Sequence, residues 1–201
     1  MFTKTQKIIK NIEDDIRGMY EIRVHGRAGQ GAKTVAQFLA EAVLRSGDFV
    51  QAFPSYGPER EGAAMDAFIR IDKKPIQIHS QIYNPNILAI IDPTLLVEKT
   101  IIAGVKPHGA IIINSQADNP LLKNILFAGK IYVLDASAIA KKHLKKDIPN
   151  LVILGVISRI INIQTTIIED IIREKFMSKF GSEMTEANLK AFQEGADIAK
   201  K

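Results

Sequence analysis

The composition of this 201-residue chain limits both its fold and the chemistry that it can perform. With 46% hydrophobic and 24% charged residues, the chain can bury one sizeable core, and nothing indicates a second core. The net charge is +5, but the lysines are scattered and not interleaved with aromatic residues, so we expect no nucleic-acid partner. The absence of cysteine excludes disulfides, cysteine nucleophiles and cysteine-ligated iron–sulfur clusters within this chain, and it fits a reducing compartment.

No targeting or membrane-spanning segment is evident in the sequence. Residues 1–18 are charged throughout and lack the apolar centre of a signal peptide. The longest apolar run, residues 148–163, is interrupted by Pro149 and Arg159 and is too short to cross a bilayer. We therefore expect a cytoplasmic protein with no membrane partner.

Residues 1–18 form an extension before the domain proper, which we expect to span residues 19–201. Apolar side chains recur in this extension at helical spacing, which predicts an amphipathic helix that packs on its own domain or on a partner chain. The apolar positions of this helix are Ile8, Ile9, Ile12, Ile16 and Met19.

Residues 20–46 predict a strand, a glycine-rich turn and a helix. Residues 20–24 alternate as a strand does, residues 25–31 can turn sharply, and the apolar residues that follow recur at helical spacing. Glycines allow positive φ in such a turn and leave room for an anion to approach the first amides of the helix, with Lys33 one turn in. The candidate binding residues of the turn are Gly26, Arg27, Gly29, Gln30 and Gly31.

Residues 49–53 predict a second strand, which a polar loop over residues 55–62 follows. In a doubly wound sheet this loop faces the same edge as the glycine turn, and such sheets bind their ligands at that edge. Glu59 and Arg60 could equally form a local ion pair. The candidate residues here are Tyr56, Glu59 and Arg60.

The remaining pattern alternates strands with helices, which indicates an α/β fold with a doubly wound, mostly parallel sheet. Residues 64–71 alternate and then turn into residues 75–78, which predicts a hairpin-like insertion antiparallel to the other strands. Further strands are expected at residues 87–91, 110–113 and 131–134, with helices from about Thr94 to Ala103 and from about Ser137.

The last fifty residues predict a helical C-terminus. Residues 151–161 are apolar almost all round, so we expect a buried helix there. The sequence Thr166 to Glu169 has the form of a capping box that opens a helix over residues 167–180, and Thr185 opens another.

The glycine turn nearly matches two nucleotide-binding motifs. As a dinucleotide fingerprint it has Gly26 and Gly31, but Ala28 replaces the middle glycine and the second strand carries Gln51 where a carboxylate belongs. As a P-loop it has the same two glycines and a later aspartate, Asp92, after an apolar strand. The extra alanine at position 32 delays the lysine by one residue, about 100° around the helix.

The glycine turn also has a simpler interpretation, and the histidines predict no further site. The glycine turn can be a tight strand-to-helix connection that binds no ligand, and this is as well supported as any small-molecule site. The four histidines show no metal-ligand spacing among themselves or with carboxylates, so we expect no metal site. They are His25, His79, His108 and His143.

Five sequence blocks between residues 19 and 195 occur in the order of a known family. They are YEIRVHGRAGQGAKT (residues 20–34), AFPSYGPEREGA (52–63), IHSQIYNP (78–85), DPTLL (92–96) and NLKAFQEG (188–195). Together they resemble the gamma subunit of 2-oxoacid:ferredoxin oxidoreductases, most closely the pyruvate type.

The resemblance implies a non-catalytic part of a larger enzyme. In that family, alpha, beta, gamma and delta chains together convert pyruvate and coenzyme A to acetyl-CoA and carbon dioxide, with ferredoxin as the electron acceptor. It implies that thiamine diphosphate, Mg²⁺ and 4Fe-4S clusters are held by the other chains, that this chain alone binds no cofactor and is inactive, and that its loops border the coenzyme A path or a subunit interface. Gamma chains for 2-oxoisovalerate or 2-oxoglutarate, or an independent nucleotide-binding protein, are the alternatives.

The chain departs from the family pattern at three places. Ala28 stands where the family has a second glycine, and Glu61 stands where it commonly has arginine. Residues 1–18 lie outside the resemblance. These departures bear on how closely a phosphate can approach the glycine turn and its neighbouring loop.

Overall fold

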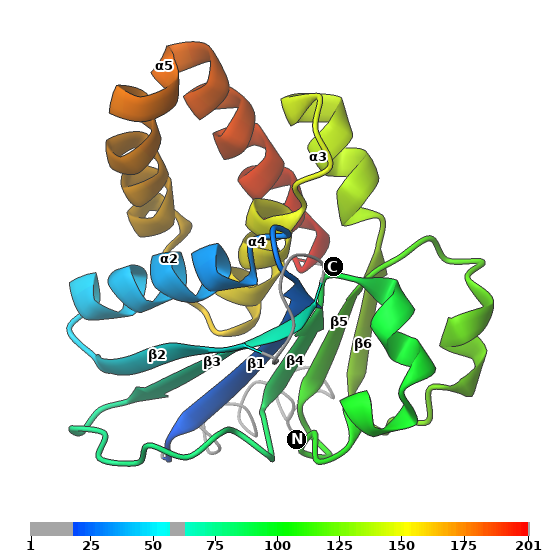
Figure 1. The fold of residues 1–201 in the computed structure, drawn as a ribbon. Helices are drawn as coiled ribbons and strands as arrows, with labels where there is room; N and C mark the ends of the chain where they lie inside the picture. The colour runs from blue at the N-terminus through cyan, green and yellow to red at the C-terminus, as the bar shows by residue number, and fades with distance from the viewer. Residues whose placement is uncertain (1–17, 57–62, 201) are drawn as a thin grey trace, which may run out of the picture.

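The computed structural model describes residues 18–56 and 63–200 and places a six-stranded sheet at the centre of the domain (Figure 1). The strands lie in the order β2-β3-β1-β4-β5-β6. Their bounds are β1 Tyr20–Arg27, β2 Phe49–Tyr56, β3 Ala64–Asp72, β4 Ile87–Ile90, β5 Ala110–Asn114 and β6 Lys130–Leu134.

The sheet is mostly parallel, as the sequence predicts, and β3 is the strand that runs the other way. β1, β4, β5 and β6 pair in parallel, whereas β3 pairs antiparallel with β1 on one side and with β2 on the other. The antiparallel direction of residues 64–71 is therefore confirmed, but the expected partner at residues 75–78 is wrong, because that segment forms no strand. Both edges of β3 are already paired, so no edge is left for residues 75–78.

Helices cover one face of the sheet. They are α2 (Ala32–Arg45), α3 (Ala136–Leu144), α4 (Asn150–Ile160) and α5 (Thr165–Ile198), and Figure 1 shows α2 and α4 directly on the sheet with α5 beyond them. Alternate residues of each strand, such as Ile22, Val24 and Ala67, meet the helices in one large aliphatic core. The helix expected over residues 151–161 is confirmed, and it is buried all round because it lies between the sheet and α5.

The α4 and α5 helices cross closely enough to require glycine on both sides. A Cβ added at Gly195 would lie 2.1 Å from the carbonyl oxygen of Val152, and one added at Gly155 would lie 2.2 Å from that of Phe192. No real Cβ tolerates such a distance, so these glycines set the separation of the two helices.

The α5 element is a helical hairpin bent at Gly181, whose φ of 76° and ψ of 176° are not helical. Two helices, one on each side of this bend, were expected from the sequence and are confirmed. The predicted capping box at Thr166 is wrong, because the helix already begins at Thr165 with Gln164 as its N-cap. Glu169 instead accepts a hydrogen bond from Gln193 on the returning arm, at 3.1 Å.

The opposite face of the sheet is covered by short 3-10 helices and loops. They are η1 (Pro93–Val97), η2 (Lys99–Ile102) and η3 (Pro120–Asn124), and they enclose a second, smaller core around Leu88, Ile90, Ile111 and Ile113. The doubly wound architecture is thus present, but the expected helix over residues 94–103 is wrong. Glu98 is extended and divides it, and β-branched residues on either side favour extended backbone.

Within the described ranges, 18–56 and 63–200, no helix combines the length and the apolar character that crossing a membrane requires.

Candidate functional site

The glycine turn lies at the carboxyl end of β1 and is shorter than the sequence suggests. The strand continues through Gly26 to Arg27, because those residues pair with β3, and only residues 28–31 turn. The Arg27 backbone N–H donates to the Gln30 side-chain oxygen at 2.8 Å, and the Gln30 N–H donates back to the Arg27 carbonyl at 3.0 Å. Gln30 therefore closes the turn with its own side chain.

Gly31 is the N-cap of α2 and is the glycine that the turn depends on most. Its φ is 87°, in the left-handed region that favours glycine, and a Cβ there would lie 2.3 Å from the side-chain nitrogen of Asn150 on α4. Gly26 is different, because an added Cβ would meet only ordinary contacts. The position of Gly31 thus couples the turn to the helical core.

Asp92, two residues after the end of β4, connects the glycine turn to the start of η1. One carboxylate oxygen accepts from Arg27 Nε at 3.1 Å and from Gln30 Nε2 at 2.8 Å. The other accepts from the backbone N–H of Thr94 at 2.9 Å and from its hydroxyl at 2.6 Å. All four lone-pair positions of this buried carboxylate are engaged within the protein.

These contacts also set the protonation of Asp92. Burial raises the pKa of its carboxyl, but hydrogen bonds from the Thr94 hydroxyl, the Gln30 amide and the Thr94 backbone, with the charge of Arg27, outweigh burial. The pKa of Asp92 therefore lies below its ordinary value, and the carboxylate is ionised at neutral pH.

The same geometry argues against both nucleotide motifs. A magnesium-binding aspartate needs free oxygens, whereas those of Asp92 are hydrogen-bonded to neighbouring residues. In a dinucleotide fold the second strand lies beside the first, whereas here β3 separates β2 from β1. Gln51 on β2 hydrogen-bonds Arg70 instead of facing a ribose. Lys33 is exposed on α2.

A hollow of about 680 Å³, lined mostly by polar residues, lies at the same edge of the sheet as this turn, along the carboxyl ends of β4, β5 and β6. Pro93 forms one wall, and Asn114 lies beneath it, donating to the Ile91 carbonyl at 2.8 Å and to the Ser137 hydroxyl at 3.1 Å. The Lys141 ammonium, 2.9 Å from the Asp147 carboxylate, lowers the pKa of Asp147. The edge of the sheet where α/β folds bind ligands is therefore open and hydrophilic.

The structure describes some of the predicted site residues but not all of them. Gly26 and Arg27 are the last two residues of β1, and Gly29, Gln30 and Gly31 lie in the turn that follows. Tyr56 is the last residue of β2, opposite Met65 of β3. Glu59 and Arg60 lie outside the described residues, so their expected position beside the turn stays a prediction.

Sequence reasoning missed two buried arginines on the loop-covered face of the sheet. Arg70, 1% exposed, bonds the Glu21 carboxylate at 3.0 Å, the Gln51 amide oxygen at 3.0 Å and the Gln81 carbonyl at 3.2 Å. Arg23 donates to the carbonyls of Ile82, Ile101 and Ala103. Both alternate with aliphatic residues along their strands, a pattern that equally fits a solvated face.

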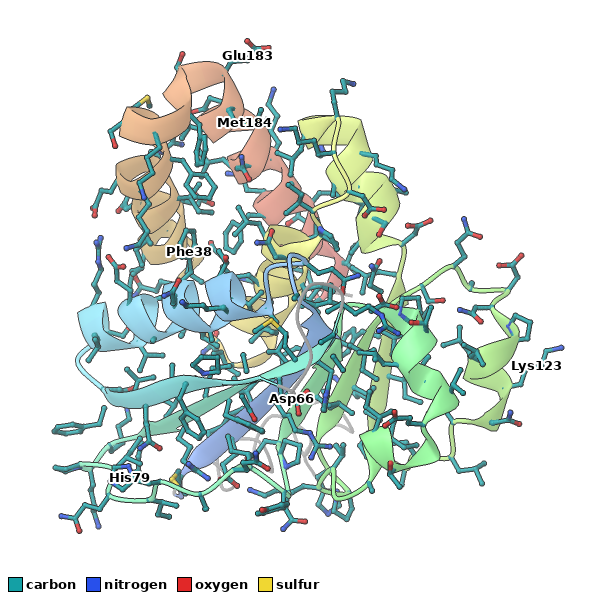
Figure 2. All side chains as sticks on the ribbon, in the orientation of Figure 1. Phe38, Asp66, His79, Lys123, Glu183 and Met184 are labelled. Atoms are coloured by element: carbon teal, nitrogen blue, oxygen red, sulfur yellow. The ribbon has the colours of Figure 1, made fainter. Side chains whose placement is uncertain are left out.

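His25 continues this polar row, and its Nδ1 lies against the Asp66 carboxylate across β1 and β3. Figure 2 shows Asp66 near the middle of the sheet, among the side chains that line this face. Among the described residues, no group of three or more histidines, aspartates or glutamates is arranged to hold a metal ion. The row therefore acts within the described structure as a set of buried polar contacts between strands and loops.

The fold and the turn together define a class of protein. It is an α/β domain that presents a helix N-terminus and a polar hollow at the carboxyl edge of its sheet, and the polar groups around the turn serve mainly to rigidify it. Such a surface suits binding or packing against a partner chain.

Comparison with known proteins agrees with this class. The model of the family described as pyruvate ferredoxin/flavodoxin oxidoreductase matches residues 21–198. The pyruvate synthase subunit PorC of Thermotoga maritima is 43% identical over 183 residues, which cover 90% of this chain and 95% of that protein. The common gamma subunit of the pyruvate/ketoisovalerate oxidoreductases of Thermococcus litoralis is 41% identical over 180 residues, 87% of this chain and 96% of that one.

Solved structures give the same result. The crystal structure of the pyruvate oxidoreductase subunit PORC from Thermotoga maritima has a TM-score of 0.78 at 41% identity, covering 89% of this chain and 96% of that chain. A 2-oxoglutarate:ferredoxin oxidoreductase from Magnetococcus marinus has a TM-score of 0.77 at 25% identity, covering 90% of this chain but only 31% of that chain. The chain therefore belongs to the pyruvate ferredoxin/flavodoxin oxidoreductase family, as a gamma-type subunit of a 2-oxoacid oxidoreductase.

Proposed function

We propose that this chain is the gamma subunit of a cytoplasmic pyruvate:ferredoxin oxidoreductase. The complex converts pyruvate and coenzyme A to acetyl-CoA and carbon dioxide with reduction of ferredoxin, and it also runs in reverse. The observation that carries the proposal is the 43% identity, over nearly the whole length of both chains, to a pyruvate synthase subunit. The relative that serves both pyruvate and ketoisovalerate oxidoreductases makes 2-oxoisovalerate the second substrate to test.

The chemistry of the chain supports a division of labour within the complex. The sequence has no cysteine to ligate an iron–sulfur cluster. Alpha, beta and delta chains are proposed to supply thiamine diphosphate, Mg²⁺ and the 4Fe-4S clusters and to pass electrons to ferredoxin. This chain is proposed to bind none of these cofactors and to be inactive alone.

The glycine turn is proposed to border the path of coenzyme A. Its helix N-terminus attracts the phosphates of such a ligand, and a hollow of about 680 Å³ lies farther along the same edge of the sheet. Lys33 places an exposed positive charge in the first turn of α2. The structure of a related oxidoreductase with coenzyme A and succinyl-CoA bound supports looking for coenzyme A here.

Reconstitution tests the subunit assignment. Purified alpha, beta and delta chains are mixed anaerobically with or without this chain, and dye reduction is followed with pyruvate, 2-oxoisovalerate or 2-oxoglutarate in the presence of coenzyme A. We expect activity only when all four chains are present, and highest with pyruvate. Full activity without this chain would refute the assignment, and a preference for another 2-oxoacid would replace pyruvate.

A charge reversal tests the coenzyme A path in the reconstituted complex. Lys33→Glu is expected to raise KM for coenzyme A several-fold and leave KM for pyruvate unchanged, because the added carboxylate repels the phosphates. Lys190→Glu, on the exposed side of α5, is the matched control and should change neither constant. Equal KM values for coenzyme A in both variants would remove the glycine turn from that path.

A further inference from the structure

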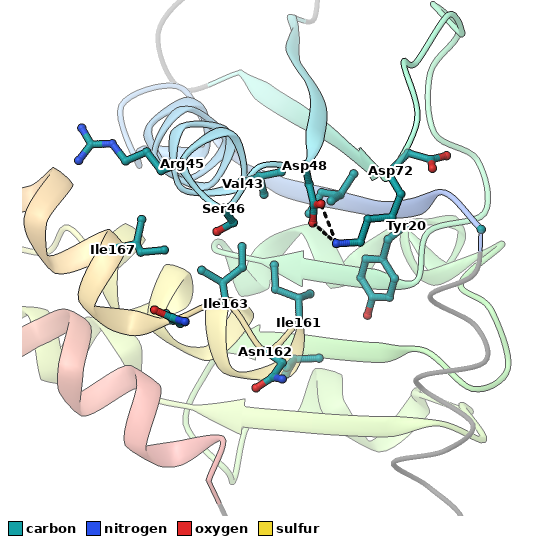
Figure 3. A pocket seen from close by; sticks show the side chains of 15 residues that line it. Tyr20, Val43, Arg45, Ser46, Asp48, Asp72, Ile161, Asn162, Ile163 and Ile167 are labelled. Atoms are coloured by element: carbon teal, nitrogen blue, oxygen red, sulfur yellow. Dashed lines mark hydrogen bonds and ion pairs between the residues drawn. The ribbon is translucent and has the colours of Figure 1, made fainter.

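A groove lies at the end of the sheet opposite the glycine turn. It is a hollow of about 540 Å³ between the start of β1, the end of β3, the last turn of α2 and the loop that joins α4 to α5. Figure 3 shows Ile161 and Ile163 side by side on the α4–α5 loop, below the end of α2 that carries Val43, with Tyr20 at one side. No part of the candidate site described above contributes to it.

The walls of this groove are aliphatic and its rim is charged. Asp48 and Lys73 form an ion pair of 2.6 Å at one margin, and Arg45 stands at the other (Figure 3). The isoleucines of the α4–α5 loop remain partly exposed, so the groove holds apolar surface that the described residues leave uncovered. The aliphatic lining residues are Val43, Ile71, Ile160, Ile161, Ile163 and Ile167.

We propose that this groove is the docking site of residues 1–17 of the same chain. Gly18, the first described residue, itself lines the groove, so the chain outside the described part starts at its rim. The apolar stripe of residues 1–17, Ile8, Ile9, Ile12 and Ile16, supplies side chains of the same aliphatic kind as the walls. A segment tethered at the rim has a high effective concentration there, which a separate chain lacks.

The family model begins its match at residue 21, so residues 1–17 lie outside the shared domain. The isoleucines of the α4–α5 loop lie within the matched range. The proposal concerns the packing of this chain alone and does not depend on its role in the oxidoreductase.

Paramagnetic labelling tests the proposal directly, since the chain has no native cysteine and one introduced thiol gives one label. Lys10→Cys carries a nitroxide on the side of the segment away from its apolar stripe. In the full chain with isotope-labelled isoleucine methyls, we expect the nitroxide to broaden the methyl NMR signals of Ile161 and Ile163 strongly. The same label on Lys123→Cys, in η3 on the far side of the sheet (Figure 2), should leave those methyls sharp.

Two further samples separate the possible occupants. In the labelled Lys10→Cys chain, the added pair Ile12→Ser and Ile16→Ser should restore sharp groove methyls, while Lys4→Ser with Lys7→Ser should not. Broadening that appears on a labelled-methyl chain mixed with a separate nitroxide chain would overturn the proposal in favour of a second copy. Sharp groove methyls that shift only when alpha, beta and delta chains are added would overturn it in favour of a partner subunit.

Discussion

On the face of the sheet beneath α2, α4 and α5 the strands present almost only aliphatic side chains, whereas β1 and β3 carry buried arginines on the other face. The helical face can be apolar because helices satisfy their own backbone groups. The loop that covers β1 and β3 cannot do so, and Arg23 and Arg70 donate to its carbonyls. Buried guanidinium groups thus take the place of secondary structure where a loop packs on a sheet.

The largest expected effect is on the helical face. Gly195→Val places methyl groups where the α4 backbone now lies and must push the helices apart, so we expect a loss of at least about 4 kcal/mol in the free energy of unfolding. Urea denaturation followed by circular dichroism measures it. Lys190→Val, exposed on the same helix, controls for helix propensity, and a similar loss in both variants would disprove the close crossing.

The second-largest loss in the free energy of unfolding is expected on the loop-covered face of the sheet. Arg70→Met leaves the Glu21 carboxylate and two loop carbonyls without their donor, so we expect a loss of about 3–5 kcal/mol. Adding Glu21→Gln should recover part of this loss, since the buried charge disappears. Arg173→Met, which breaks an exposed pair with Glu186, is the control and should cost much less. Equal losses in the free energy of unfolding at positions 70 and 173 would show that the buried arginine of the loop-covered face matters no more than an exposed one.

At the edge between the two faces, Gly31→Ala tests the coupling of the turn to α4. The positive φ and the contact with Asn150 predict a loss of about 1–3 kcal/mol. Gly26→Ala, near the end of β1 and with ordinary φ and space, should cost under about 1 kcal/mol. The two thermal unfolding curves decide, and coincident curves would mean that Gly31 is replaceable.

The smallest effect concerns the protonation of Asp92. Because its pKa lies below the ordinary value, Asp92 contributes stability above about pH 3.9, the unfolded value, and this is lost as the pH falls through the folded pKa. Asp92→Asn should therefore cost about 1–2 kcal/mol at pH 7 and progressively less below pH 4. Urea titrations at several pH values measure the difference, and a constant gap would show that the charge is irrelevant.

Much of the fold could be predicted because strand and helix periodicities are local. Residues 87–91 and 110–113 are apolar on both faces and were assigned correctly as central strands. The insertion of β3 between β2 and β1 depends on pairing between distant residues, which no local pattern encodes. The two 3-10 helices that replace the helix expected from Thr94 are divided at Glu98, whose backbone is extended, and the local pattern of residues 94–103 does not encode that division.

The candidate site was less predictable than the fold. The glycines located the turn, but the roles of Gln30 and Asp92 depend on which side chains the folded chain brings together. Arg70 alternates with aliphatic residues, as a solvated residue would, and only the packed loop over it reveals its burial. The ligand and interface roles of the turn, and of Tyr56, Glu59 and Arg60, stay predictions.

The place of β3 in the sheet also has a consequence for how quickly the protein can fold. β2 and β3 follow each other in sequence, so their pairing closes a short loop, whereas β1 must join β3 and β4 across long stretches of chain. Such non-local pairing is slow. We therefore expect the folding rate to depend more on the joining of β3 and β4 to β1 than on the pairing of β2 with β3.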